Sequence, residues 1–328
     1  MFMSRHNLIL GVAALALLAT VALPASAASL FWDQMSSASA ANWGINATAD
    51  TLTTFGFDYS TAGIPEAPHS MGGDVPTVGV KLEANIVDPG ESNQISLYPT
   101  GQSFNGYYKL SFDAWMNYDV QEVIQGDSAG TTEFIGGGVG YNGTATDLGS
   151  GVQAVGTGDG GSAFDYRVFK SNNTDPAFFV PDAQMAGGSR NANQPWWESF
   201  LPGQTPPAGQ APPQAALAGP DGTLGFQWVT WNIGVQGDDV YISLEKPNGD
   251  VNLMAHLNCG ASTGTGDSGC TTDGNIMLFY ADFFSSVSPR AVWTYGIIDN
   301  VHVTEIPEPS SLVLLGLASL ACFGRRSR

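Results

Sequence analysis

The chain has 328 residues, of which 30 are Asp or Glu and 11 are Lys or Arg, and it contains 41 glycines and 19 prolines. The formal net charge of −19 argues against nucleic acid as a partner, because phosphate recognition needs clustered Lys and Arg. The glycine content excludes a coiled coil or a helical bundle, and the 43% hydrophobic content excludes a disordered chain. We therefore expect a folded, acidic, glycine-rich protein.

Residues 1–27 have the pattern of a secretory signal peptide. The basic pair Arg5-His6 precedes an apolar run at residues 8–23, and small residues follow where signal peptidase cuts. The predicted cleavage site consists of Ala25, Ala27 and Ala28. A membrane anchor is the alternative, but the helix-breaking Pro24 favours cleavage. The mature chain is expected to begin near Ala28, outside the cytoplasm.

The C-terminal end combines three features in a fixed order. Pro307-Glu308-Pro309 is followed by an apolar run at residues 312–323, and then by Arg325, Arg326 and Arg328. The apolar run is shorter than the roughly 20 residues of a comfortable membrane span, and the arginines would stay on the cytoplasmic side. This order predicts a short transmembrane helix that anchors the protein transiently for processing. A simple tail anchor is the alternative.

The same order closely resembles the PEP-CTERM sorting signal of Gram-negative bacteria. The resemblance covers residues 306–328 and implies an exosortase as the processing partner, in bacteria that make exopolysaccharide or biofilm. It implies export across the inner membrane, anchoring before processing, and a final place at the cell surface or in the extracellular matrix. The chain then divides into a signal peptide at 1–27, an extracellular domain at 28–305 and a sorting signal at 306–328.

Removing both ends makes the domain more acidic. Residues 28–305 keep 29 of the 30 acidic residues but only 7 of the 11 basic ones, for a net charge of about −22. Such a charge is compatible with calcium, which prefers oxygen ligands. The candidate ligands lie in glycine turns and are Asp159, Asp165, Asp267 and Asp273. Aspartates in turns also cap backbone amides, so this ordinary role is the alternative.

Cys259 and Cys270 are predicted to form a disulfide. They bracket a loop of about 12 residues in a compartment that permits oxidation, and closing it would contribute roughly 2–3 kcal/mol. A metal site is disfavoured because neither cysteine has a second ligand two to four residues away.

Strand alternation recurs through the domain, whereas helical periodicity is nearly absent. Residues 107–116 and 228–235 alternate between apolar and polar side chains, and the polar face of the first run carries Lys109, Ser111 and Asp113. A turn at Asp238-Asp239 leads into a hairpin partner at residues 240–245. Later strands are predicted at residues 275–280 and 295–304. Strands spread over the whole domain favour one all-β, two-sheet sandwich of the jelly-roll type.

Two segments resemble concanavalin-A-like lectin and glucanase sandwiches. They are the closing strand at residues 296–301 and the hairpin at residues 228–244. The resemblance covers about a quarter of the chain and implies the fold, not an activity.

The stretch at residues 186–222 differs from the rest because it is rich in Pro, Gln, Gly and Ala. Since proline blocks ladder hydrogen bonds, we predict a long loop insertion between strands. It carries Trp196 and Trp197, which either form an exposed platform or fold back over the sandwich as a plug.

No catalytic pattern is found in the sequence. It lacks a Glu-x-Asp-x-Glu strand, a Gly-x-Ser-x-Gly elbow and a zinc-binding HExxH, and the glycines at 136–138 lack the lysine of a phosphate loop. Sugars are bound by aromatic faces, for which the candidates are Trp115, Tyr141, Trp196 and Trp197. The alternative for these rings is a place in the core.

These observations favour an exported, non-catalytic surface or matrix protein that binds exopolysaccharide or a surface partner. A secreted glycan-degrading enzyme of the same fold, either a hydrolase or a lyase, is one alternative. A purely structural matrix protein is the other.

Overall fold

A computed structural model describes residues 27–70, 75–87, 91–120, 133–144, 149–173, 177–210, 217–284, 287–288 and 290–307. Within these ranges, Ser29–Thr304 forms a compact unit. Most of the predicted signal peptide, including Ala25, and the sorting signal beyond Pro307 lie outside the described residues. The described ranges contain no helix that is both long and apolar enough to span a membrane, and the span predicted at 312–323 lies outside them.

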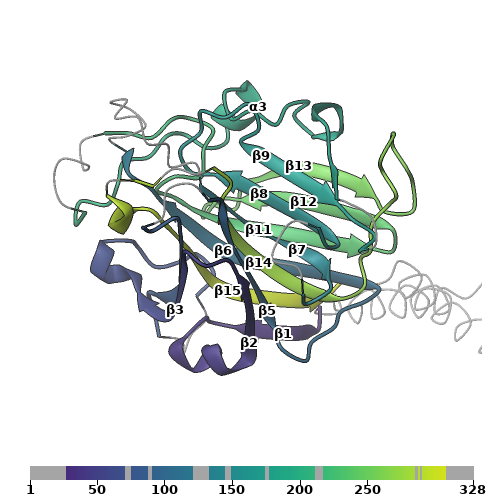
Figure 1. Cartoon of the computed structure of the whole chain (residues 1–328), viewed down its shortest axis with the longest axis horizontal. Helices are drawn as coiled ribbons and strands as arrows, with labels where there is room; N and C mark the ends of the chain where they lie inside the picture. Colours follow the sequence, from purple (N-terminus) through teal and green to yellow (C-terminus); the bar gives the residue numbers. More distant parts are fainter. Residues whose placement is uncertain are drawn as a thin grey trace, which may run out of the picture. The chain divides into compact units, whose positions relative to one another are not determined.

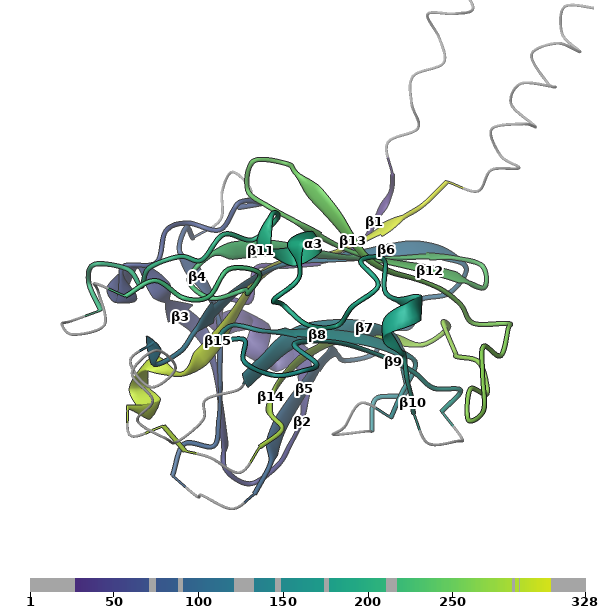
Figure 2. The ribbon, with the colours of Figure 1, turned by 90° about the horizontal axis from the view of Figure 1, so that it is seen from above.

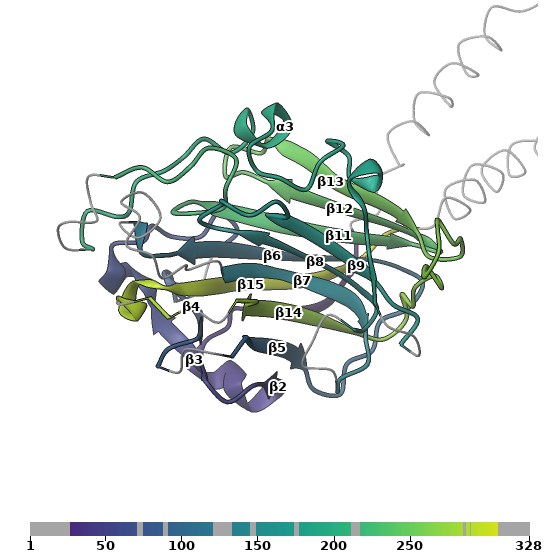
Figure 3. The ribbon, with the colours of Figure 1, turned by 45° about the horizontal axis from the view of Figure 1, so that its top comes forward.

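The compact unit consists of two antiparallel sheets that face each other as two layers (Figure 2). The eight-stranded sheet has the order β13-β12-β11-β6-β15-β4-β3, and β1 also pairs with β15. Figure 3 shows the spatial order from β13 at the top to β3 below. Its strands are β1 (Ser29–Asp33), β3 (Thr51–Asp58), β4 (Val78–Ala84), β6 (Tyr107–Asn117), β11 (Trp228–Gln236), β12 (Asp239–Glu245), β13 (Val251–Asn258) and β15 (Tyr295–Glu305).

The seven-stranded sheet has the order β10-β9-β8-β7-β14-β5-β2. Its strands are β2 (Trp43–Ala47), β5 (Asn93–Pro99), β7 (Glu133–Tyr141), β8 (Val152–Thr157), β9 (Tyr166–Lys170), β10 (Phe178–Phe179) and β14 (Asn275–Asp282). Short helical turns connect the strands at η1 (Ser37–Asn42), η2 (Tyr59–Ala62), η3 (Asp182–Gln184), α3 (Pro195–Glu198) and η5 (Ala291–Trp293) (Figure 1). The predicted all-β sandwich is confirmed.

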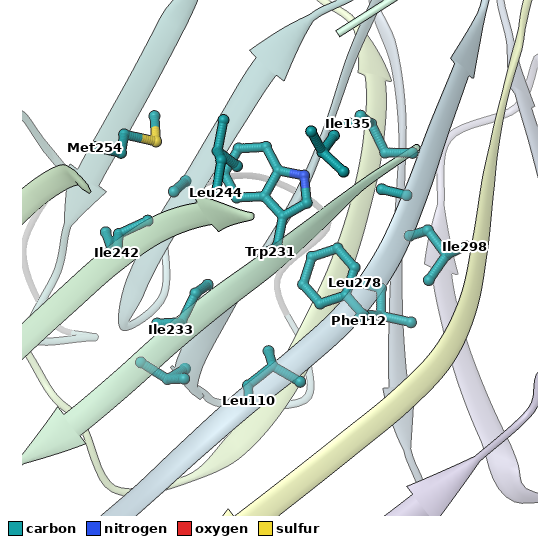
Figure 4. Close-up of a cluster of buried hydrophobic side chains, with 14 of the residues drawn as sticks. Leu110, Phe112, Ile135, Trp231, Ile233, Ile242, Leu244, Met254, Leu278 and Ile298 are labelled. Carbon is teal, nitrogen blue, oxygen red and sulfur yellow. The ribbon is translucent and has the colours of Figure 1, made fainter. Parts of the chain in front are cut away.

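Alternation along β6 and β11 builds the core between the sheets. Successive side chains of a strand point to opposite faces, so Leu110 and Phe112 of β6 face inward together with Trp231 and Ile233 of β11 (Figure 4). The rings of Phe112 and Trp231 stack with centroids 6.3 Å apart. All four side chains are fully buried.

The β11–β12 hairpin is present, but its turn lies at Gly237-Asp238, one residue before the predicted Asp238-Asp239. Asp239 pairs with Gln236 and therefore belongs to the strand. Gly237 has a φ of 67°, in the left-handed region that a tight hairpin turn requires and that glycine adopts without strain.

The glycines of β7 allow close packing in the middle of the seven-stranded sheet. A Cβ atom at Gly136 would collide with the carbonyl oxygen of Ala154, and one at Gly137 would lie 2.7 Å from the carbonyl oxygen of Met277. These glycines are thus explained by backbone approach and not by a phosphate loop.

The described part of the insertion at 186–222 packs against the edge strand β13 and against β9. Ala186 N donates to the carbonyl oxygen of Met254 of β13 at 2.9 Å, and α3 lies beside β13 in Figure 3. Trp197 of α3 is fully buried and stacks on Tyr166 of β9, with ring centroids 3.8 Å apart. Trp197 therefore follows the predicted plug, because its ring is buried against the sandwich. Trp196 is 39% exposed and remains accessible at the surface.

Cys259 and Cys270 form a disulfide in the structure, with Cα atoms 4.5 Å apart. The loop between them includes Asp267, whose carboxylate accepts a hydrogen bond from Lys170 Nζ at 2.8 Å. This ion pair is buried and ties the loop to β9.

Candidate functional site

A pocket of about 210 Å³ opens on the outer face of the eight-stranded sheet. Outward-facing side chains of five strands and one loop residue form it, because residues that alternate with core residues must face away from the core. Its lining residues are Trp32, His69, Lys109, Ser111, Asp113, Thr230, Asn232, Glu245, Asn300 and His302.

Strand register places the polar side chains of the pocket in rows across the sheet. Thr230 of β11 lies opposite Asp113 of β6 on one side and Glu245 of β12 on the other. Asn232 takes a hydrogen bond from Ser111 Oγ at 2.8 Å and donates one to Glu245 Oε2 at 3.1 Å. The side chains of the pocket are thus held by one another on rigid strands.

Asp113 is the centre of this arrangement. It is fully buried, and its carboxylate accepts four hydrogen bonds. The donors are His69 N at 3.0 Å, His69 Nδ1 at 2.8 Å, Thr230 Oγ1 at 2.5 Å and Asn300 Nδ2 at 2.9 Å. A carboxylate offers about four lone-pair positions, so Asp113 has no acceptor capacity left for a ligand.

A segment at residues 59–70 brings His69 to Asp113 by folding over the outer face of the sheet. Its anchor is Tyr59, which is buried against Trp228 with ring centroids 5.3 Å apart and donates to Asp299 Oδ2 at 3.0 Å. Trp228 Nε1 in turn donates to the carbonyl oxygen of Pro65 at 2.8 Å. An aromatic cluster thus fixes the segment and leaves His69 at the edge of the pocket.

His69 is held in one orientation but remains accessible. Its Nδ1 atom donates to Asp113, and its side chain is 49% exposed, which leaves Nε2 as the ring nitrogen for the pocket. The hydrogen bond to Asp113 raises the pKa of His69 above its usual 6.5, against the opposing effect of burial. A protonated imidazole would present an N–H donor to a ligand.

Three of the four aromatic residues predicted for sugar binding are buried. Trp115 and Tyr141 are 4% and 2% exposed, and Trp197 is not exposed at all. Trp115 packs against Trp228 beneath the 59–70 segment, and Tyr141 OH accepts a hydrogen bond from Asn46 at 2.7 Å. Of the four, Trp196 alone is more than marginally exposed.

The aspartates predicted to bind calcium are mostly occupied by local contacts. Asp165 accepts the backbone N–H groups of Ser162 and Ala192, and burial raises its pKa. Burial opposes ionisation of Asp267 too, but hydrogen bonds from Lys170 and Thr263 lower its pKa to about 2. Within the described part of the chain, no three His, Cys, Asp or Glu residues are grouped to hold a metal ion. The structure therefore does not gather these aspartates into a metal centre within the described ranges, and calcium binding stays a prediction from the sequence.

The remaining two aspartates of that prediction lie in different environments. Asp159 is buried and accepts a hydrogen bond from Thr157 Oγ1 at 2.7 Å, and burial raises its pKa to about 8. Asp273 is exposed.

The sequence did not predict the pocket, although it placed several of the lining residues on one face of a strand. The alternation of β6 placed Lys109, Ser111 and Asp113 on the outer face. His69 is separated from Asp113 by 44 positions, and no sequence pattern joins them. Trp32, on the first strand, belongs to no sequence pattern that points to a binding site.

Comparison with solved structures finds chains of low similarity. The carbohydrate-binding module CBM66 from Bacillus subtilis is 10% identical, with a TM-score of 0.35, over 80% of this chain and 96% of that one. The exoplasmic/lumenal domain of VIP36 in its Ca²⁺-bound form is 8% identical, with a TM-score of 0.42, over 83% and 87%. A glycosyl hydrolase family 16 protein from Mycobacterium smegmatis is 11% identical, with a TM-score of 0.38, over 84% and 100%.

At these scores the matches support no statement about function. No curated protein matches the sequence. A protein-family model described as the PEP-CTERM protein-sorting motif matches residues 305–328. The chain therefore carries a PEP-CTERM sorting motif at its C-terminal end.

Proposed function

We propose that this protein is exported to the cell surface or extracellular matrix and binds a polysaccharide there without cleaving it. The PEP-CTERM motif implies export with processing by an exosortase. The proposed binding site is the pocket on the outer face of the eight-stranded sheet.

One observation carries this proposal: an aromatic ring stands beside hydrogen-bonding side chains on a rigid sheet. Trp32 of β1 lies opposite His302 of β15 and is half-buried, so part of its indole remains accessible. A sugar ring has an apolar face and several hydroxyl groups, which suit an indole and nearby amide and carboxylate groups respectively. Asn232 and Glu245 supply such groups.

The outer face continues beyond the pocket and could hold further sugar units. Tyr241 of β12 and Leu253 of β13 are each 37% exposed, and Tyr241 stacks on His256 with centroids 4.2 Å apart. Neighbouring strands are about 4.8 Å apart, so the distance from β1 to β13 is about 24 Å. That distance suits a polymer better than a single sugar.

The carboxylates of the pocket support binding more than hydrolysis. Glycosidases generally need two carboxyl groups that flank the scissile bond. In this pocket Asp113 is saturated by four donors, which leaves Glu245 as the carboxylate that can reach a ligand.

A glycan-cleaving enzyme is a second candidate because of the pair formed by His69 and Asp113. A histidine oriented by a buried carboxylate is a suitable general base. In that case His69 would have to be unprotonated at Nε2 to accept a proton from the substrate.

One experiment separates these functions. Because Ser29–Thr304 is a compact unit with its own core, residues 28–305 can be tested on a glycan array and in cleavage assays with the bound polysaccharides. Binding without new reducing or unsaturated ends supports the proposal. Turnover that is lost in His69→Gln supports the enzyme, and absence of binding in every case supports a purely structural role.

A further inference from the structure

Lys109 differs from the other basic residues in having no partner within the described ranges. Six of the seven Lys and Arg residues of the domain contact a carboxylate or an aromatic ring. These pairs are Lys81–Glu83, Lys170–Asp267, Arg190–Asp182, Lys246–Asp250 and Arg290–Asp119, while Arg167 lies over the ring of Phe134. Lys109 lines the pocket instead.

An unpartnered lysine is unexpected in this domain. Acidic residues outnumber basic ones by 29 to 7 between residues 28 and 305, so a carboxylate is easily found for each cation. On β11, the residue opposite Lys109 is Gly234, which has no side chain to pair with the ammonium group or to cover it. The strand register therefore leaves this charge available to a ligand.

Glu245, the acceptor carboxylate of the pocket, lies in a different row of the sheet. Its register partner Thr230 lies opposite Asp113, four positions along β6 from Lys109. At about 3.3 Å per residue this is about 13 Å along the strand. The two charges can consequently contact different groups of one ligand.

Of the two histidines of the pocket, His69 adds to its cationic character and His302 does not. Asp113 raises the pKa of His69, while Glu245 favours and Lys109 opposes protonation of its ring. Burial, and to a lesser extent the charge of Lys109, lowers the pKa of His302 below its usual value, which favours its neutral form. His302 Nε2 is 2.9 Å from Ser29 Oγ.

We propose that the pocket selects an acidic polysaccharide, in which Lys109 pairs with an anionic substituent of the bound sugar unit. This inference rests on the proposed binding function and names the ligand class. A carboxylate of a uronic acid and a sulfate ester share the required charge. The net charge of the domain repels anionic polymers in general, so a local cation is needed to offset this at the site.

The test compares residues 28–305 with Lys109→Gln in binding polygalacturonate, its carboxyl-reduced neutral form, dextran sulfate and dextran. We expect the protein to bind at least one acidic polymer about tenfold more tightly than its neutral counterpart, a difference of about 1.4 kcal/mol, because a charge-assisted hydrogen bond forms only with the acidic polymer. Lys109→Gln should lose most of this preference, so that its affinities for the acidic and the neutral polymer become similar. Lys246→Gln removes the same charge from a lysine paired with Asp250 and should keep the preference.

Each outcome has a separate meaning. A preference for polygalacturonate that depends on Lys109 assigns a carboxylate, and one for dextran sulfate assigns a sulfate ester. Equal binding of acidic and neutral polymers, or a preference that survives Lys109→Gln, overturns this inference but leaves polysaccharide binding intact. Absence of binding to all four polymers and across the glycan array contradicts the proposed function itself.

Discussion

Asp113 accepts two hydrogen bonds from His69. Its Oδ2 atom accepts one from the backbone N–H at 3.0 Å, and its Oδ1 atom accepts one from Nδ1 of the imidazole at 2.8 Å. The first contact fixes the end of the 59–70 segment, and the second orients the ring. A single buried carboxylate thus couples the position of a loop to the protonation of a side chain in the pocket.

Replacing Asp113 by Asn should destabilise the domain and lower the pKa of His69 toward 6.5. An amide cannot accept all four hydrogen bonds, and leaving buried donors unsatisfied costs about 1–3 kcal/mol. Urea denaturation measures the first effect and NMR titration of the imidazole measures the second. The control is Asp239→Asn, which removes the carboxylate of an exposed pair with His256 and should cost less than about 1 kcal/mol. An unchanged pKa of His69 would contradict the described contact.

Protonation of His69 should make stability depend on pH. Because the pKa of His69 is raised in the folded state, its stabilising contribution is complete below the unfolded value of about 6.5 and is lost as pH rises through the folded pKa. The difference in free energy of unfolding between the wild type and His69→Gln should therefore shrink as the pH increases above 6.5. A difference that grows with pH would show that the neutral imidazole is the stabilised form.

Asp159 should also make the fold less stable as pH rises, because burial raises the pKa of its carboxyl group to about 8. Between the unfolded pKa near 4 and the folded pKa, the native state holds a proton that the unfolded chain has released, so the wild type loses stability as pH rises. Asp159→Asn removes this loss and can still accept the hydrogen bond from Thr157. The stability of the variant relative to the wild type should thus increase from pH 4 to pH 8 in denaturation experiments.

The exposed Asp250 provides the control for this titration. Its pKa is lowered, first by the hydrogen bond from Asn248, so its contribution is already complete above the unfolded pKa. Asp250→Asn should show no relative gain between pH 5 and pH 8. A similar gain in both variants would attribute the effect to net charge and not to burial.

The neighbouring residues Trp196 and Trp197 should differ sharply in their effect on stability. Trp197→Ala removes a fully buried ring that stacks on Tyr166, and loss of such a ring costs about 3–5 kcal/mol. Trp196→Ala removes a ring that is 39% exposed and should cost less than about 1 kcal/mol. Thermal or urea denaturation of the two variants measures the loss of stability in each. Equal losses would contradict the different burial of the two rings.

The central strands of the eight-stranded sheet could be predicted from the sequence, because alternation of apolar and polar residues is a local pattern. Alternation along residues 107–116 and 228–235 assigned the inward-facing side chains correctly, since side-chain direction in a strand has a period of two. The burial of Trp115 could not be predicted in this way. It alternates onto the outer face, and only the path of the 59–70 segment covers it.

The sequence by itself determined the C-terminal sorting motif, the acidic character of the domain and its all-β class, because each depends on composition or on the order of nearby residues. It also supplied the outward placement of Lys109 and Asp113 on one strand. Only the tertiary structure decided that His69, Trp32 and Glu245 join them in one pocket, because strand register and a loop contact across 44 positions bring these residues together. The free energy of such contacts depends on the packing of the whole sandwich, which no local pattern contains.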